Sequence, residues 1–295
     1  MTFFLNLLVT GLVVGSVYSL VAMGFVLIFK ASRVVNFAQG EFLMVGSYVC
    51  LSLLVWASLP YPAAVLGTLS FAVLLGVLVE RVVLRPMIGE PVLSVVMITL
   101  GLSSVLRAAV QAAYGTDIRP YPEFFSGEPF RFGAVPVTPA YVGSFVSVLI
   151  LIGLLSAFFR YSKAGVAMRA AAFNQQVALS MGISVKRMFA LAWAIAAVVS
   201  AIGGIFLGNM RGGVDGSIAF IGLKVIPVVI LGGLDSLTGA LVGGLIVGVL
   251  ENLAGGYLDG YVGGGAKEVA PFFLLILILM VRPYGLFGTE EIERV

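Results

Sequence analysis

The chain has 295 residues, of which 60% are hydrophobic and 11% are charged, with a formal net charge of +3 and a mean hydropathy of +1.13. Soluble domains carry about 25% charged residues, so this composition indicates a membrane protein. The absence of His and the single Cys exclude Ser/His/Asp catalysis and argue against a metal site of the usual His/Cys type, so we expect none. A charge this small gives no reason to expect a nucleic-acid partner.

The apolar runs are long enough to cross a bilayer as helices, which takes about 20 residues each. They predict an all-α, polytopic helical membrane protein of about eight transmembrane helices, forming a single domain over residues 1–295. The first run lacks a preceding basic segment and is too long for a signal peptide, so we expect it to persist as a span. The expected spans are residues 3–29, 41–57, 63–80, 92–113, 141–159, 188–208, 224–252 and 269–281.

Basic residues predict the orientation, because cytoplasmic loops carry an excess of Lys and Arg. Lys30 and Arg33 follow the first span, and Arg81 and Arg85 lie beside another loop. The loop at 160–187 is flanked by five cations: Arg160, Lys163, Arg169, Lys186 and Arg187. These loops are therefore expected inside, the N-terminus outside, and the loops 114–140 and 209–222 outside. The side of the C-terminus stays open, since it depends on whether a broken segment re-enters.

Two polar breaks interrupt the apolar runs, one at 36–41 and one at 232–236. Unpaired backbone in lipid is costly, and interrupted segments in matching positions of two halves are typical of transporters built as inverted repeats. We therefore expect the side chains of both breaks to line a translocation path, whereas ordinary loops at the membrane surface are the alternative. The path candidates are Asn36, Gln39, Glu41, Asp235 and Ser236.

The inner loop 160–187 contains the signals of a short helix. Asn174 is a good N-cap and Gly182 a good residue to follow the last turn, so a helix is expected over 175–181. Val177, Ala178 and Met181 would lie on one side of it. Such an apolar knob suits docking of another protein, and a plain surface helix is the alternative.

Besides Glu41, four charges fall within or near spans: Glu80 and Lys224 near span ends, where they can reach the headgroups, and Arg107 and Glu251 deeper in the bundle. Unpaired charges at depth are costly, so each is expected either in a structural ion pair or in contact with substrate. Small residues four apart, such as Gly11 and Gly15, indicate close helix packing.

These motifs together resemble the permease subunits of bacterial branched-chain amino acid ABC importers, over nearly the whole chain. The matching segments are 24–29, 35–41, 46–48, 80–86, 160–170, 181–183, 232–233, 239–244 and 282–288, with Ala178 and Glu251. The family often has His at the position of Gln39 and Gly at the position of Asp235, and either difference could accompany another substrate.

The resemblance implies a multi-pass subunit of the bacterial inner membrane that pairs with a second, similar permease. Two cytoplasmic ATP-binding cassette subunits and a periplasmic substrate-binding protein would complete the importer, and loop 160–187 would couple to the ATPases. The chain has no Walker A loop, so ATP and Mg²⁺ are expected on the partner chains and no cofactor on this one. Alternatives are a stand-alone secondary transporter or channel, and a urea, amide or small organic acid substrate.

Overall fold

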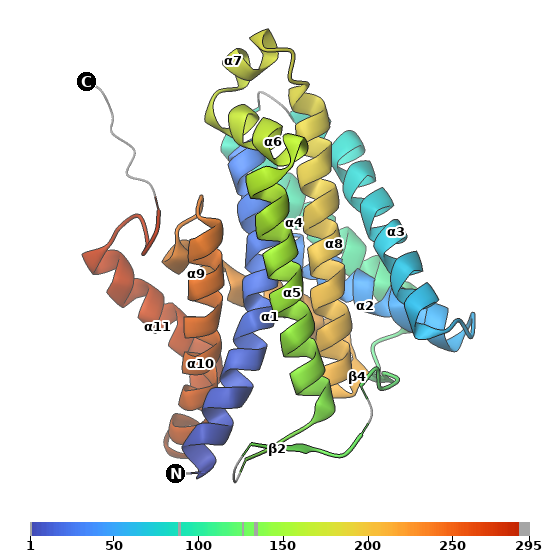
Figure 1. The fold of residues 1–295 in the computed structure, drawn as a ribbon, viewed down its shortest axis with the longest axis vertical. Coiled ribbons are helices and arrows are strands. Elements are labelled where there is room, and N and C mark those ends of the chain that lie inside the picture. The colour runs from blue at the N-terminus through green and yellow to red at the C-terminus, as the bar shows by residue number, and fades with distance from the viewer. Residues whose placement is uncertain (1, 88–89, 126, 133–134, 289–295) are drawn as a thin grey trace.

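The computed structural model describes residues 2–87, 90–125, 127–132 and 135–288, and they form a bundle of helices (Figure 1). Its centre is the pair α1 (Thr2–Ser32) and α8 (Val185–Arg211). The two helices run antiparallel: a Cβ at Gly24 would lie 3.3 Å from the Cα of Ala196, and one at Gly203 would lie 2.9 Å from the Val21 side chain. Both are apolar or small on nearly every side, which is the pattern of a fully buried helix.

Glycines let α10 (Leu237–Val262) approach α1 at backbone distance. A Cβ at Gly15 would lie 2.7 Å from the carbonyl oxygen of Gly244, and one at Gly11 would lie 2.7 Å from the Cα of Val249. Packing rather than hydrophobicity drives helix association in lipid, so these contacts stabilise the centre of the bundle. The expected helix packing through small residues is confirmed.

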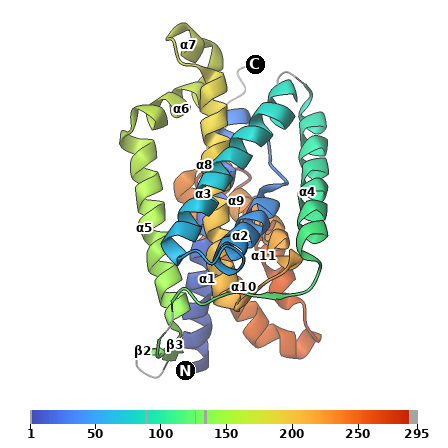
Figure 2. The same cartoon turned by 90° about the vertical axis from the view of Figure 1, so that its right-hand side faces the viewer.

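Two short helices begin inside the bundle. α2 (Gln39–Val55) crosses α8 steeply, and Figure 2 shows it almost end-on while α5 and α8 run upright. The 3₁₀ turn η3 (Gly216–Phe220) leads into α9 (Ile221–Gly232), which forms an antiparallel hairpin with α10. The predicted span 224–252 is therefore two helices joined by a turn, and the predicted span 41–57 is a 17-residue helix.

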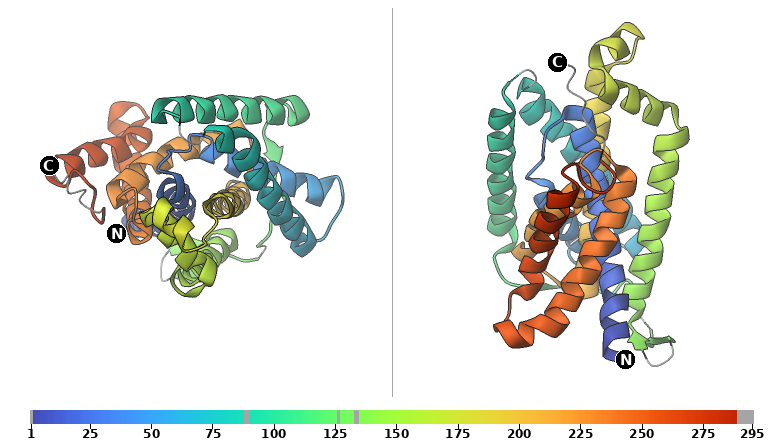
Figure 3. Two further views of the ribbon diagram at one scale, coloured as in Figure 1. Left: turned by 90° about the horizontal axis from the view of Figure 1, so that it is seen from above. Right: turned by 90° about the vertical axis from the view of Figure 1, so that its left-hand side faces the viewer.

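The outer layer is formed by α3 (Tyr61–Val79), α4 (Val92–Tyr114), α5 (Pro139–Tyr161) and α11 (Ala266–Val281). α3 continues through a π-helical turn, η1 (Glu80–Leu84), and a 3₁₀ turn, η2 (Arg85–Met87). It packs on α8, where a Cβ at Gly76 would lie 2.6 Å from the Trp193 carbonyl oxygen. α4 lies at the edge of the bundle and is mostly exposed (Figure 3).

Among the described residues, six helices are long and apolar enough to cross a membrane: α1, α3 with its two short turns, α4, α5, α8 and α10. The all-α polytopic class is confirmed, but the expected count of eight full spans is not. The second and eighth expected spans are the shorter helices α2 and α11, of 17 and 16 residues.

The outer end of the bundle carries two small two-stranded sheets, formed by the expected loop 114–140 and the segment after α8. Strand β1 (Arg119–Pro120) pairs antiparallel with β4 (Gly213–Val214), and β2 (Phe130–Phe132) pairs with β3 (Val135–Val137). Tyr121 follows β1 and is buried beside Gly208, and this burial raises the pKa of its phenol well above the ordinary value. The phenol therefore stays protonated at physiological pH.

The opposite end carries α6 (Lys163–Phe173) and α7 (Gln175–Ser180), at the top of Figure 1. The cations flanking the loop 160–187 gather here, so the positive-inside rule makes this the cytoplasmic end. Residues 282–288 lie here too, because the Leu286 amide donates to the Leu231 carbonyl at the end of α9 over 2.8 Å. The chain as far as Gly288 therefore lies at the cytoplasmic end, which the sequence had left open.

One order of elements occurs twice along the chain. A long buried helix is followed by a polar break, a short apolar helix and two further helices, first as α1 to α4 and then as α8 to α11. α3 packs on α8, and α10 packs in the equivalent way on α1. Since α1 and α8 are antiparallel, the two halves form an inverted repeat.

Candidate functional site

The first polar break closes on itself deep inside the bundle. The Asn36 side chain accepts a hydrogen bond from the Ala38 amide over 3.0 Å and donates one to Gln39 Oε1 over 3.1 Å. Gln39 Nε2 in turn donates to Ser200 Oγ over 2.7 Å, near the middle of α8. Asn36, Gln39 and Ser200 are all buried. The backbone that leaves helix at this depth is therefore covered by protein, as a non-helical segment in a membrane requires.

One ion pair and one hydrogen bond hold the start of α2 against α4. Arg107 donates to Glu41 Oε1 over 2.6 Å, and the Phe37 amide donates to Thr99 Oγ1 over 3.4 Å. Glu41 also lies in the first turn of α2, where the helix dipole favours a negative group. This pair fixes the beginning of the short helix against the outer layer.

The first turns of α2 and α9 meet through glycine. A Cβ at Gly40 would lie 3.0 Å from the Cα of Gly222, and one at Gly222 would lie 2.5 Å from the amide nitrogen of Gly40. The partner of the first break is therefore the segment 213–220 after α8, rather than 232–236. The prediction that residues 209–222 form an outer loop is thus wrong in part, because the end of this segment reaches inward to Gly40. The run of Gly and Asp at 212–217 after an apolar span was the signal for it.

The second predicted break is a turn at the cytoplasmic end. Gly233 has a φ of 105°, and the Ser236 hydroxyl caps α10 by accepting from the Gly239 amide over 3.0 Å. Lys30 Nζ donates to the carbonyl oxygen of Asp235 over 3.2 Å. A hollow of about 650 Å³ opens here, and its lining includes basic residues, aromatic rings and one acidic residue: Phe29, Lys30, Arg33, Arg169, Phe173, Asp235 and Tyr284.

The structure therefore does not bring the two sets of predicted path residues together. Asn36, Gln39 and Glu41 form the buried cluster at the start of α2, whereas Asp235 and Ser236 lie at the cytoplasmic turn. The alternative of an ordinary loop at the membrane surface fits this turn.

The short cytoplasmic helix forms as its signals predict. Asn174 Oδ1 accepts hydrogen bonds from the Gln176 and Val177 amides, both over 3.0 Å, and Gly182 has a φ of 80°. The expected apolar side, however, is divided. Val177 and Met181 are exposed, but Ala178 is buried in the cluster around Phe189 of α8. Placing Ala178 on the free side was wrong, because this helix rests on α8.

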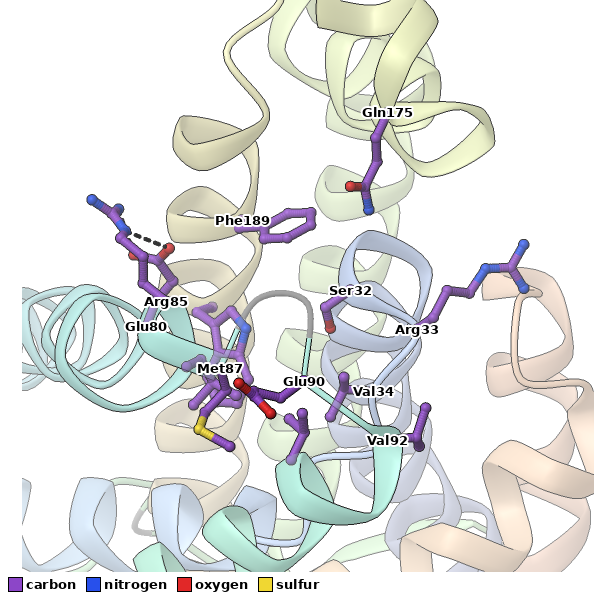
Figure 4. Close-up of a pocket in the computed structure, with 13 residues that line it drawn as sticks. Ser32, Arg33, Val34, Glu80, Arg85, Met87, Glu90, Val92, Gln175 and Phe189 are labelled. Atoms are coloured by element: carbon purple, nitrogen blue, oxygen red, sulfur yellow. Dashed lines mark hydrogen bonds and ion pairs between the residues drawn. The ribbon is translucent and has the colours of Figure 1, made fainter.

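A second hollow, of about 200 Å³, lies beneath α7 (Figure 4). Gln175 of α7 and Phe189 of α8 border it, and Ser32, the last residue of α1, and Val34, which leads into the polar break, lie on its far side. α7 is therefore linked across one small space to the segment that enters the buried cluster.

The π turn η1 also borders this hollow. Arg85 forms two hydrogen bonds to the carboxylate of buried Glu80, over 2.8 and 3.2 Å. π turns within helices often occur at functional sites. The predicted charge Glu80 is thus held at the cytoplasmic end of α3.

The deep charges lie in ion pairs. Lys224 of α9 donates to Glu251 over 2.6 Å and lies 3.4 Å from Glu268, in addition to the pair of Arg107 with Glu41. Lys224 and its position beside η3 were not among the predicted site residues. In the described part of the chain, no group of three Cys, Asp or Glu side chains is placed to hold a metal ion.

Comparisons of the sequence with known proteins identify a transport family. The family model for the permease component of the branched-chain amino acid transport system matches residues 7–282. The high-affinity branched-chain amino acid permease protein LivH of Salmonella typhimurium is 33% identical over 99% of this chain and 98% of its own length. The BraD permease protein of Pseudomonas aeruginosa is 32% identical over the same shares.

A solved structure shares the fold. The PsaBC complex of Streptococcus pneumoniae bound to a Fab contains a chain with a TM-score of 0.52 and 14% sequence identity, over 94% of this chain and 91% of that one. The match of the family model and the relatives over nearly the whole length decides the assignment. The chain belongs to the family of branched-chain amino acid transport system permease components, as a multi-pass inner-membrane transport subunit and not an enzyme.

Proposed function

We propose that this chain forms half of the translocation path of an ABC importer for branched-chain amino acids. The substrate class follows from the printed functions of the relatives, which include LivH of Escherichia coli at 33% identity over 99% of this chain. The partners would be a second, homologous permease, two ATP-binding cassette subunits that carry ATP and Mg²⁺, and a periplasmic substrate-binding protein.

One observation supports the transport role most directly: the first turns of α2 and α9 meet inside the bundle at Gly40 and Gly222. Short helices that begin at depth, next to buried polar groups, are the usual place for a substrate path in an inverted-repeat transporter. The cluster of Asn36, Gln39 and Glu41 lies at this meeting point, so we assign it to the wall or gate of the path. Asp235 and Ser236 would belong to the cytoplasmic mouth.

ATP hydrolysis on the partner subunits would act on this chain through α7. Its exposed apolar residues Val177 and Met181 form a surface that an ATPase groove can bury, while Asn174 and Gly182 fix the ends of the helix. The hollow that separates Gln175 from Val34 gives a short route from α7 to the start of the first break. A stand-alone transporter or channel has no use for such a docking surface.

Co-expression with the partner chains tests this proposal. We expect a stable complex with two ATPase chains and a second permease, and ATP-dependent leucine uptake by proteoliposomes supplied with the binding protein. Liposomes that hold the chain alone are the control and should show no uptake. Full uptake by the chain alone without ATP would show a secondary transporter or channel, and uptake of urea or a small acid in place of leucine would correct the substrate.

A further inference from the structure

Two cations lie on one exposed face of the bundle, formed by α4, η3 and the start of α9. The Arg107 side chain is 31% exposed while its partner Glu41 is 2% exposed, and Lys224 is 19% exposed while Glu251 is 1% exposed. In both ion pairs the carboxylate is covered and the cation reaches the surface. This face therefore presents positive charge.

Arg107 lies too deep to be explained by the membrane surface. With a rise of 1.5 Å per residue, it lies about 22 Å from the start of α4 at Val92 and about 10 Å from the end at Tyr114. A cation that faces hydrocarbon at such depth is costly, so ionisable groups within spans usually face protein or a water-filled cavity. The face is therefore expected to border water or protein in the assembled transporter, and not lipid.

The groups around Arg107 suit one kind of ligand. Its guanidinium carbon lies 4.8 Å from the centre of the Phe220 ring, its Nε is buried without a hydrogen-bond partner, and Phe220 and Leu223 are exposed. Lys224 follows Phe220 by one helical turn. Arg recognises carboxylates through several N–H groups at once, and an aromatic and a Leu side chain offer an apolar contact beside it. A small molecule with a carboxylate and an apolar side chain would satisfy both.

We propose that this face, defined by Arg107, Phe220, Leu223 and Lys224, lines the path, and that Arg107 binds the carboxylate of the passing amino acid. The inference rests on the proposed transport function and adds a specificity-determining residue to it. Glu41 then acts as a positioning residue, because it holds the guanidinium at the edge of the face through a 2.6 Å bond and leaves its other N–H groups to the ligand.

The chain contains a matched control pair. Arg85 is 33% exposed and bonded over 2.8 Å to Glu80, which is 1% exposed. This pair has the same chemistry and burial but lies at the cytoplasmic end. Neutralising both members of a pair avoids leaving a buried charge without its partner, which would by itself destabilise the fold.

The test compares R107Q/E41Q with the control E80Q/R85Q at the cytoplasmic end of α3, in the complete transporter reconstituted with binding protein and ATP. We expect leucine uptake to fall at least tenfold in R107Q/E41Q, while ATP hydrolysis stimulated by the binding protein and the half-saturating concentration of that protein stay within about twofold of wild type. In E80Q/R85Q, which borders the hollow beneath α7, uptake and ATP hydrolysis should change by the same factor. R107K, which keeps the cation, should restore a large part of the rate.

Each outcome decides the question. Wild-type uptake by R107Q/E41Q would overturn the inference while leaving the proposed function intact. Loss of the complex on gel filtration in R107Q/E41Q would assign the face to contact with the second permease and would also overturn it. Absence of leucine uptake in the wild-type transporter would instead refute the proposed function.

Discussion

At the scale of single residues, Gly40 is the position where the least change should have the largest effect. A Cβ there would overlap the carbonyl oxygen of Ala219, and backbone on both sides leaves no side chain to move away. We expect G40A to lower the thermal unfolding temperature in detergent by several degrees and to reduce the yield of folded protein. Gly101 of α4 is the matched control, because no atom lies within 4 Å of its Cβ position.

Both glycines lie in helices, so replacement by Ala changes helix propensity equally at the two positions. Any difference between G40A and G101A then reports the contact of the added methyl group with its neighbours. In an exposed helix Ala is favoured over Gly by about 1 kcal/mol, and G101A should be neutral or stabilising. Equal unfolding temperatures for G40A and G101A would show that α2 and α9 do not touch as closely as described.

At the scale of one element, α7 has a buried side and a free side, which makes it possible to test docking without disturbing the fold. Met181 is exposed at the end of the helix, whereas Ala178 packs on α8. We expect M181D to reduce ATP-driven uptake tenfold or more, because a charge in a docking surface must be desolvated there. The measurement is uptake together with ATPase activity in proteoliposomes.

The matched control lies at the other end of the bundle. Val262, the last residue of α10, is exposed like Met181 and is far from α7 (Figure 1). V262D should leave the coupling of ATP hydrolysis to uptake unchanged. An M181D transporter that couples normally would remove α7 from the energy route.

At the scale of the whole molecule, the orientation in the membrane can be read with thiol labels. Cys50 is fully buried, so a Cys introduced at an exposed position should be the only reactive thiol. We expect a membrane-impermeant maleimide to label S180C in α7 only in inside-out vesicles, and D117C only from the outer side. The reverse pattern would invert the sidedness inferred from the basic residues.

The sequence alone was enough to predict those structural elements whose signals act over a few neighbouring residues. The long apolar runs, the Asn174 cap and the glycine at 182 each act within a few residues, and the structure has them where they were predicted. The partner of the first break was not predictable in this way. The contact of Gly40 with Gly222 joins residues 182 positions apart, and no local pattern states which of several glycines will meet.

Ion pairing illustrates the same limit. A charge in an apolar run shows that a partner or water must be near, but the sequence does not say which. Arg107 pairs with Glu41 across 66 residues and Lys224 with Glu251 across 27, through packing that only the tertiary fold creates. Ala178 was misplaced for a related reason, since helical spacing gives the sides of a helix but not which side meets α8.

The antiparallel arrangement of α1 and α8 has an energetic consequence for the transport cycle. In an inverted repeat we expect a loosening of α2 toward the outer end to have a counterpart in a loosening of α9 toward the inner end, so that the outward-open and inward-open forms resemble each other with the halves exchanged. Conformers built from equivalent contacts differ little in free energy, and about 1.4 kcal/mol then changes their ratio tenfold. α5, which lies between the two repeats and has no counterpart in the second, breaks this equivalence.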